Sequence, residues 1–369
     1  MFDYDENLIK ITEFKMSGDL PDIFTFKNGK KLTDKSDWPL RRTEILKDAV
    51  DLQYGVLPPE PEVLEVYPIN RTPRMQFFKI ITGTKEKTVD IIMMAVLPEG
   101  KGPFPAVISG DITFDIVYDK DYLNTFTDNG IMPVFFNRLD LVADRLEKSV
   151  SPLYDIYPNL NFGAIAAWAW GYSRTVDALE KLGIADMDCI AFTGHSRGEK
   201  TALLAGALDT RAAIVNTNES GAGGGGCYRV NIKAINEDGI EQRNETLKDL
   251  YTNFHYWFNK ELFDYIDREE ELPFDEHMLK ALVAPRILLS SDAASDIWAN
   301  PVGTYITNLE AKKLYEFLNV PENLIWYFRK GSHRQKPEDI GMLVNVIRHY
   351  KFGENLNNNF LKLPFKFEK

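Results

Sequence analysis

Short apolar runs alternate with helical segments over most of this sequence, from residue 104 to residue 330. Runs of this kind, bounded by turn-forming or charged residues, are typical of strands that are buried on both faces. They occupy residues 104–110, 131–137, 188–194, 212–218, 286–292 and 324–330. Helical spacing with few breaks lies between them, most clearly at residues 161–183 and 197–209. This alternation predicts an α/β fold, a three-layer αβα sandwich with a mostly parallel central sheet.

The segment before this alternation carries two further signals. A helix is expected from about Pro39 to Tyr54, because Gly55 and a proline-rich bend follow it. Residues 75–99 read as two strands around a Gly-Thr-Lys turn.

The predicted elements suggest a single domain over residues 1–369, since the motifs described below are spread over most of the chain. Residues 1–35 are mixed and polar and are expected to form an N-terminal extension with a turn at Asn28–Gly29. Residues 354–369 are expected to form a docked C-terminal tail. The chain shows no internal repeat and no low-complexity tract.

Composition excludes several classes of function. The net charge of −12 and the pI of about 5.1 argue against nucleic acid or an anionic membrane as a partner. Cys189 and Cys227 form neither a disulfide framework nor a metal-ligand pattern, and the sequence holds no HExxH, CxxC or Walker motif, so we expect no metal and no cofactor. The first sixteen residues lack an apolar core typical of a signal peptide, which predicts a cytoplasmic protein unless a leader was removed.

A serine between two glycines marks the candidate catalytic position. Gly194-His195-Ser196-Arg197-Gly198 fits G-x-S-x-G, a pattern that is weak by itself and could mark a structural turn. Its context is stronger, because a buried strand precedes it and an Ala/Leu-rich helix follows. Strand, sharp turn and helix in this order predict a nucleophile elbow.

A nucleophilic serine needs a base, and the chain order of α/β-hydrolases is serine, acid, histidine. His333 lies in the loop after the last predicted strand, where this order places the base. The other histidines fit less well and are expected at the surface or in the core: His195, His255, His277 and His349.

Two positions compete for the acid. Glu219 follows the strand at 212–218, and Asp296 follows the next strand, with Asp292 as a lesser variant there. Both strand ends point to the same face of a parallel sheet, so topology allows either. Each could instead be a loop carboxylate that caps a helix.

The glycine run at residues 221–226 also satisfies G-x-G-x-x-G, the dinucleotide fingerprint. No amphipathic helix opens directly after it, which disfavours nucleotide binding. The run is better explained as backbone that passes close to an active-site acid or to substrate.

Five motifs in the same order give the chain a resemblance to a known family. They are "GHSRGEK", "NESGAGGGGCYR", "NFHYWFN", "ELPFDEHMLKALVAPR" and "DIWANPVG". Together they resemble the glucuronoyl esterases among the carbohydrate esterases, also called 4-O-methyl-glucuronoyl methylesterases, from Asp37 to about Gly353. Members of this family are α/β-hydrolases that cleave the ester between a glucuronic acid carboxyl on xylan and a lignin alcohol, without metal.

The resemblance implies roles for the candidate triad. Ser196 matches the family nucleophile and His333 its base. Glu219 matches the acid of one branch, at the same separation of 23 positions from the serine. Asp296 lies in the region that carries the acid in other members.

The resemblance also implies substrate contacts. Arg197 matches an arginine that helps to stabilise the oxyanion, and a backbone N–H at this position is an expected donor as well. Lys200 is similar to a lysine that contacts sugar hydroxyls, and Trp298 to a tryptophan that borders the sugar. Trp257 is a further candidate for an apolar floor under the sugar, unless it is a core residue.

The chain departs from the fungal pattern at two positions. Fungal members have a cysteine before the nucleophile and another after the histidine, where this chain has His195 and Arg334. This difference fits a reducing compartment. Residues 230–254 do not align cleanly with the sugar contacts of the family.

These features predict a serine carboxylester hydrolase that acts on esters of glucuronic acid or its 4-O-methyl derivative. The expected partner is a small-molecule or oligosaccharide substrate, and nucleic acid and membrane are not expected. The alternatives are a carbohydrate esterase for other esters, such as acetyl-xylan, and a non-catalytic carbohydrate-binding relative. Oligomeric state is not predicted by these features.

Overall fold

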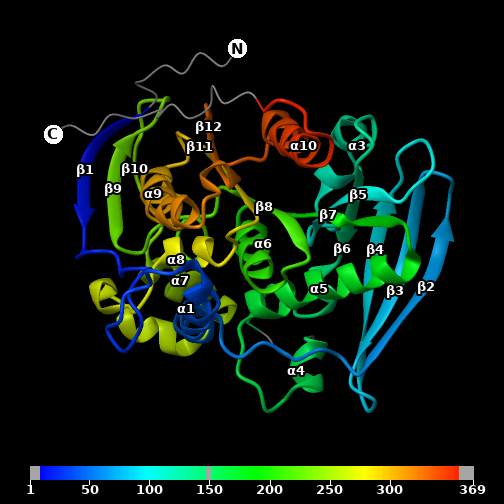
Figure 1. The fold of residues 1–369 in the computed structure, drawn as a ribbon, viewed down its shortest axis with the longest axis horizontal. Coiled ribbons are helices and arrows are strands. Elements are labelled where there is room, and N and C mark those ends of the chain that lie inside the picture. The colour runs from blue at the N-terminus through cyan, green and yellow to red at the C-terminus, as the bar shows by residue number, and fades with distance from the viewer. Residues whose placement is uncertain (1–8, 147–150, 357–369) are drawn as a thin grey trace.

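A long β-sheet runs through the computed structural model, which describes residues 9–146 and 151–356 (Figure 1). Within these residues, nine strands form it in the order β12-β11-β8-β7-β5-β6-β4-β3-β2. Neighbouring strands from β12 to β6 are parallel, and those from β6 to β2 are antiparallel. The strands are β2 (Val63–Arg71), β3 (Met75–Gly83), β4 (Thr88–Val96), β5 (Phe104–Ser109), β6 (Met132–Phe136), β7 (Ala185–Thr193), β8 (Ala212–Asn218), β11 (Ile287–Ala293) and β12 (Leu324–Arg329).

Helices cover both faces of this sheet (Figure 1). Successive side chains of a strand point to opposite faces. On β5, Ile108 accordingly joins the core shared with α5 (Ala164–Leu182) and α6 (Arg197–Leu208), while Val107 packs with α3 (Lys120–Thr127) and α10 (Pro337–Phe352). The predicted three-layer αβα sandwich with a mostly parallel sheet is therefore confirmed.

The helix expected from Pro39 to Tyr54 is also present. It consists of α1 (Trp38–Ile45), a π-helical segment (Leu46–Asp51) and α2 (Leu52–Tyr54). Gly55 ends it with a φ of +86°, a conformation that favours glycine. The remaining α-helices of the described residues are α4 (Pro152–Ile156), α7 (Leu247–Phe254), α8 (Glu276–Ala281) and α9 (Pro301–Phe317).

A second, smaller sheet was not expected. It is antiparallel and consists of β1 (Lys10–Met16), β9 (Val230–Ile235) and β10 (Glu241–Arg243), at the opposite end of the molecule from β2 (Figure 1). Residues 10–16 are thus a paired strand within the segment expected to form an N-terminal extension. The turn at Asn28–Gly29 is present, with Gly29 at a φ of +82°. Residues 357–369 of the expected tail lie outside the described residues.

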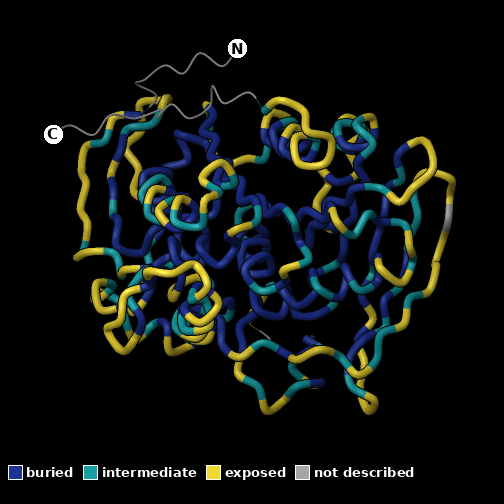
Figure 2. The backbone as a smooth tube through the Cα atoms, viewed as in Figure 1, coloured by how far each residue is buried: buried dark blue, intermediate teal, exposed yellow. Residues whose placement is uncertain are grey.

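Burial follows the arrangement of the strands. The central parallel strands are buried on both sides, whereas β1 and much of the outermost strand β2 are exposed (Figure 2). No helix among the described residues has the length and apolar character needed to cross a membrane. Because parallel strands end at one edge, the residues that follow β7, β8, β11 and β12 come together there, and they carry the candidate site.

Candidate active site

Ser196 occupies a strained turn between β7 and α6. Its φ of +57° and ψ of −123° are rare for a residue with a side chain and are characteristic of a residue held by its surroundings. A Cβ atom on Gly194 would lie 2.2 Å from the carbonyl oxygen of Gly198, and a Cβ on Gly198 would lie 2.7 Å from an oxygen of Asp111. Both glycines of the motif are therefore required by close packing, as the predicted elbow demands.

His333 contacts both Ser196 and Asp296. Its Nε2 lies 3.0 Å from the Ser196 hydroxyl oxygen, and its Nδ1 lies 2.6 Å from an oxygen of Asp296. The Asp296 carboxylate can only accept, so Nδ1 carries the hydrogen and Nε2 accepts the serine proton. Asp296 is buried, whereas the imidazole is 42% exposed, which leaves the reacting side open to a substrate. The three groups form an uninterrupted hydrogen-bonded chain.

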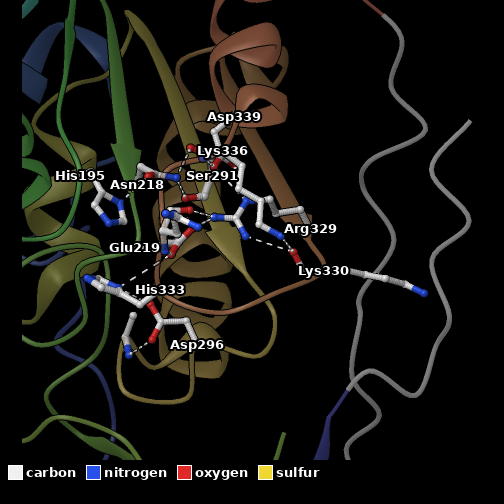
Figure 3. A network of polar contacts seen from close by, with 12 residues as sticks. His195, Asn218, Glu219, Ser291, Asp296, Arg329, Lys330, His333, Lys336 and Asp339 are labelled. Atoms are coloured by element: carbon white, nitrogen blue, oxygen red, sulfur yellow. Dashed lines mark hydrogen bonds and ion pairs between the residues drawn. The ribbon is translucent and has the colours of Figure 1, made fainter. Parts of the chain in front are cut away.

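Glu219, the other acid candidate, holds the loop of His333 in place. Its nearer oxygen lies 3.8 Å from His333 Nδ1, too far for a hydrogen bond. Its two oxygens accept instead from the Arg329 guanidinium and, at 2.9 Å, from the backbone N–H of Arg334. Figure 3 shows Arg329 between Glu219 and Asp339, with His333 between Glu219 and Asp296.

The electrostatics of Glu219 are those of a buried ion pair. Burial raises the pKa of its carboxyl, and the Arg329 guanidinium opposes this rise. Because both oxygens accept hydrogen bonds from N–H groups, the ionised form is the one that fits this geometry. Arg329 also bonds Asp339 through its Nε, at 2.9 and 3.0 Å, so one guanidinium joins β12, α10 and the end of β8.

Arg197 begins α6, so its backbone N–H has no partner within the helix and points out of the helix end. Its guanidinium donates to Asp144 at 2.5 Å and lies over the rings of Trp257 and Phe254. Asp144 also accepts from Trp257 Nε1 at 2.8 Å and from Tyr256 at 2.9 Å. Burial opposes ionisation of Asp144, but the hydrogen bond from Arg197 and those from its neighbours outweigh it and lower its pKa.

Lys200 is placed differently from expectation. Its side chain is buried, and its ammonium donates to the carbonyl oxygens of Ser220 and Ala222 and to the carboxylate of Glu245 at 3.1 Å. All three of its hydrogens thus have internal partners, whereas we expected donors that face a sugar. The reason is the loop after β8, which folds back over α6 and supplies the two carbonyls.

Trp257 takes the core position that the sequence analysis had left open. Trp257 is only 3% exposed, stacks on Phe254 and donates its indole hydrogen to Asp144. Its ring therefore packs against the Arg197 guanidinium and has no exposed face for a sugar. Trp298 is 40% exposed with the Arg243 guanidinium over its ring, as expected of a residue that borders a binding site.

The glycine run explains where Glu199 points. A Cβ on Gly224 would lie 2.4 Å from an oxygen of Glu199 and 2.1 Å from the hydroxyl of Ser220. The backbone therefore passes directly over this buried carboxyl, and burial raises its pKa to about 8. Glu199 faces the protein interior, and Asp292 is likewise buried, with burial raising its pKa to about 7.

Several residues of the site were missed by the sequence analysis. Asp144, Glu245 and Arg329 each pair with a candidate residue but lie in segments without a motif. A charged residue at the end of the apolar strand, as in "LIWYFR", was a signal for Arg329. Asp144 and Glu245 gave no comparable signal.

Comparisons with known proteins identify the family of this chain. The sequence model of a family described as glucuronyl esterase, fungi, matches residues 80–319. The chain belongs to this family. It is 31% identical over 313 residues to the 4-O-methyl-glucuronoyl methylesterase 1 of Wolfiporia cocos. The aligned region covers 82% of this chain and 73% of that relative.

Solved structures of the glucuronoyl esterase family share the fold. A carbohydrate esterase family 15 glucuronoyl esterase from Caldicellulosiruptor kristjansonii has a TM-score of 0.84 and 30% identity, and the match covers 96% of this chain and 95% of that one. A serine-to-alanine mutant of the glucuronoyl esterase from Sporotrichum thermophile, in complex with methyl 4-O-methyl-β-D-glucopyranuronate, has a TM-score of 0.76 and 25% identity. This match covers 96% of this chain and 92% of that one. The chain is thus a carboxylic ester hydrolase with the α/β-hydrolase fold.

Proposed function

We propose that this protein hydrolyses esters between an alcohol and the carboxyl group of glucuronic acid or its 4-O-methyl derivative. The observation that carries the proposal is the hydrogen-bonded chain of Ser196, His333 and Asp296 in a member of the glucuronoyl esterase family. The bound methyl glucuronate in the Sporotrichum thermophile neighbour supports the choice of acyl group. The substrate is a small molecule or an oligosaccharide that carries this ester.

In the proposed mechanism, the Ser196 Oγ attacks the ester carbonyl carbon while His333 Nε2 takes its proton. His333 then passes this proton to the departing alcohol, and a covalent acyl-serine remains. Water attacks the acyl group while His333 takes one of its protons, and His333 then returns this proton to Ser196 Oγ as the uronic acid is released. Asp296 holds the ring in the tautomer that these steps need and stabilises the imidazolium.

The negative charge that develops on the carbonyl oxygen needs donors. The backbone N–H of Arg197 and its guanidinium are the proposed donors, and a single donor of this kind contributes about 2.7–4 kcal/mol to barrier lowering. Asp144 holds the Arg197 guanidinium beside α6. It accepts a hydrogen bond from Nη1 of the guanidinium and leaves the other N–H groups for the substrate.

The choice between the two acids follows the hydrogen bonds. The resemblance matched both acids to family members, and Asp296 is the one in contact with the imidazole, at 2.6 Å against 3.8 Å for Glu219. We therefore assign Asp296 to the triad and assign Glu219 to positioning the loop through Arg329 and Arg334. Trp298 is the proposed border of the sugar, because it is 40% exposed and its backbone carbonyl accepts from the backbone N–H of Glu245, the partner of Lys200.

The experiment that tests the function compares hydrolysis of benzyl glucuronate with that of 4-nitrophenyl acetate, with Ser196→Ala as the control. We expect cleavage of the glucuronate ester with a higher kcat/KM than of the acetate, and loss of both in the variant. Cleavage of the acetate alone, or of acetyl-xylan in preference to the glucuronate, would overturn the proposed acyl group. Unchanged glucuronate cleavage by Ser196→Ala would overturn the nucleophile.

A further inference from the structure

His195, the residue before the nucleophile, has no role in the mechanism above, yet its ring lies against His333. The two ring centroids are 4.6 Å apart, and the ring planes are inclined by 35°. His195 Nδ1 lies 2.7 Å from Asn218 Oδ1. Two imidazoles side by side at the mouth of a site offer nitrogen ligands to any cation that fits between them.

Asn218 fixes which nitrogen of His195 carries the hydrogen. The Asn218 amide nitrogen donates to the carbonyl oxygen of Ser291 at 3.1 Å, so its oxygen is the atom that faces His195. His195 Nδ1 must therefore donate, and Nε2 keeps its lone pair. A histidine that donates one N–H to an amide oxygen and presents the other nitrogen is oriented as metal-binding histidines are.

Glu219 completes a set of three ligands. His195, Glu219 and His333 each place one nitrogen or oxygen within 4.8 Å of the other two. Tetrahedral zinc, with bonds of about 2.0–2.2 Å, holds its ligands roughly 3.4 Å apart, so small side-chain movements close the set. Glu219 already accepts two hydrogen bonds, but a carboxylate offers about four lone-pair sites, so lone pairs remain for a metal.

Carboxylates surround the proposed ligands. Asp296 pairs with His333, while Glu219 and Asp339 both pair with the Arg329 guanidinium (Figure 3). Two imidazoles and one carboxylate are ligands that Zn²⁺ takes in many protein sites.

We propose that Zn²⁺, or another transition-metal ion that prefers nitrogen ligands, binds His195, Glu219 and His333 and inhibits the enzyme. Inhibition follows from the ligand set, because His333 cannot take the serine proton through Nε2 while a metal occupies that nitrogen. Binding through Nδ1 would displace Asp296 and have the same result. The metal is an inhibitor here and takes no part in the reaction.

Direct binding tests the site without reference to activity. The protein competes for Zn²⁺ with a chromophoric chelator, and Co²⁺ is added separately to record its visible absorption. We expect one Zn²⁺ per chain, and intense Co²⁺ bands of the kind that tetrahedral coordination gives. His195→Asn should weaken Zn²⁺ binding at least tenfold, whereas His255→Asn, which changes an exposed histidine outside the site, should leave it unchanged.

Inhibition is measured with benzyl glucuronate. Zn²⁺ should inhibit reversibly, EDTA should restore activity, Mg²⁺ should have no effect, and the inhibitory concentration should rise at least tenfold in His195→Asn. Equal Zn²⁺ affinity in the unsubstituted chain and His195→Asn, or weak Co²⁺ bands typical of hexa-aqua ions in the unsubstituted chain, would overturn the proposal. The inhibition readout rests on the proposed function, but binding does not, so zinc binding without hydrolysis would overturn only the function.

Discussion

At the scale of single residues, the structure gives the two candidate acids different roles, which the sequence did not distinguish. Asp296 and Glu219 follow neighbouring strands and reach the same edge of the sheet. Asp296 accepts directly from His333, and Glu219 accepts from the backbone of the next residue. One acid therefore sets the tautomer and the other sets the position of the loop.

We expect Asp296→Asn to lower kcat for benzyl glucuronate on the order of 10³–10⁴-fold, because an amide at this position favours the wrong tautomer of His333. Glu219→Gln should cost less than about a hundredfold, since the amide oxygen still accepts from Arg334. The measurement is the steady-state rate of both variants at matched folding, judged by thermal unfolding. A larger loss in Glu219→Gln than in Asp296→Asn would reverse the assignment.

Asp144→Asn tests the positioning of Arg197. Removing the charge of Asp144 weakens the ion pair that holds the Arg197 guanidinium, so kcat should fall roughly tenfold or more. KM should change little, because the guanidinium contacts the substrate mainly in the transition state. Tyr256→Phe is the matched control, because it removes one hydrogen bond to the same carboxylate and leaves the charge. Equal kcat values for Asp144→Asn and the unsubstituted chain would contradict the role.

The candidate site was predictable where a residue follows a predicted strand in an expected order. Ser196, His333 and the two acids were placed in this way, and the structure brings them together. The burial of Lys200 and Trp257 was not predictable, because a sequence does not show what covers a side chain. The loop after β8 encloses Lys200, and Arg197 lies over Trp257.

At the scale of elements, the buried strands and the long helices were predictable because the apolar residues of each one follow a single pattern along its whole length. The small sheet was not, since β10 has only three residues, β1 is mostly exposed, and β1 pairs with a strand more than two hundred residues away. Pairing over such a distance leaves no local pattern in the sequence.

The glycine run provides a test at this scale. Gly224→Ala places a methyl group within 2.4 Å of Glu199 and should destabilise the protein by roughly 1–3 kcal/mol, as overpacking does. Gly341→Ala in α10, where no atom lies within 4 Å of the new Cβ, should be neutral or stabilise by up to about 1 kcal/mol. Denaturant unfolding measures both. Similar stability in the two variants would show that the run is not closely packed.

At the scale of the whole molecule, buried titratable groups link stability to pH with opposite signs. Burial lowers the pKa of His195 from 6.5 to about 4, so the unfolded chain binds a proton there that the folded chain does not. This contribution is complete above pH 6.5 and is lost as the pH falls towards 4. Glu199 and Asp292, whose pKa values burial raises to about 8 and about 7, act in the opposite direction.

We therefore expect His195→Asn to flatten the loss of stability between pH 6.5 and pH 4, since both acids remain in the variant and cancel in the comparison. The midpoint of thermal unfolding is measured for both proteins across this range. A difference between them that does not change with pH would mean that His195 titrates normally in the folded protein.

The most direct test of the account is to locate the acyl group during turnover. Benzyl glucuronate is mixed with the protein, the reaction is quenched in acid within the first turnovers, and the peptides are analysed by mass spectrometry. The account predicts a glucuronoyl group on the peptide that contains Ser196, with none in Ser196→Ala. An acyl group on another residue, or rapid hydrolysis by Ser196→Ala, would contradict it.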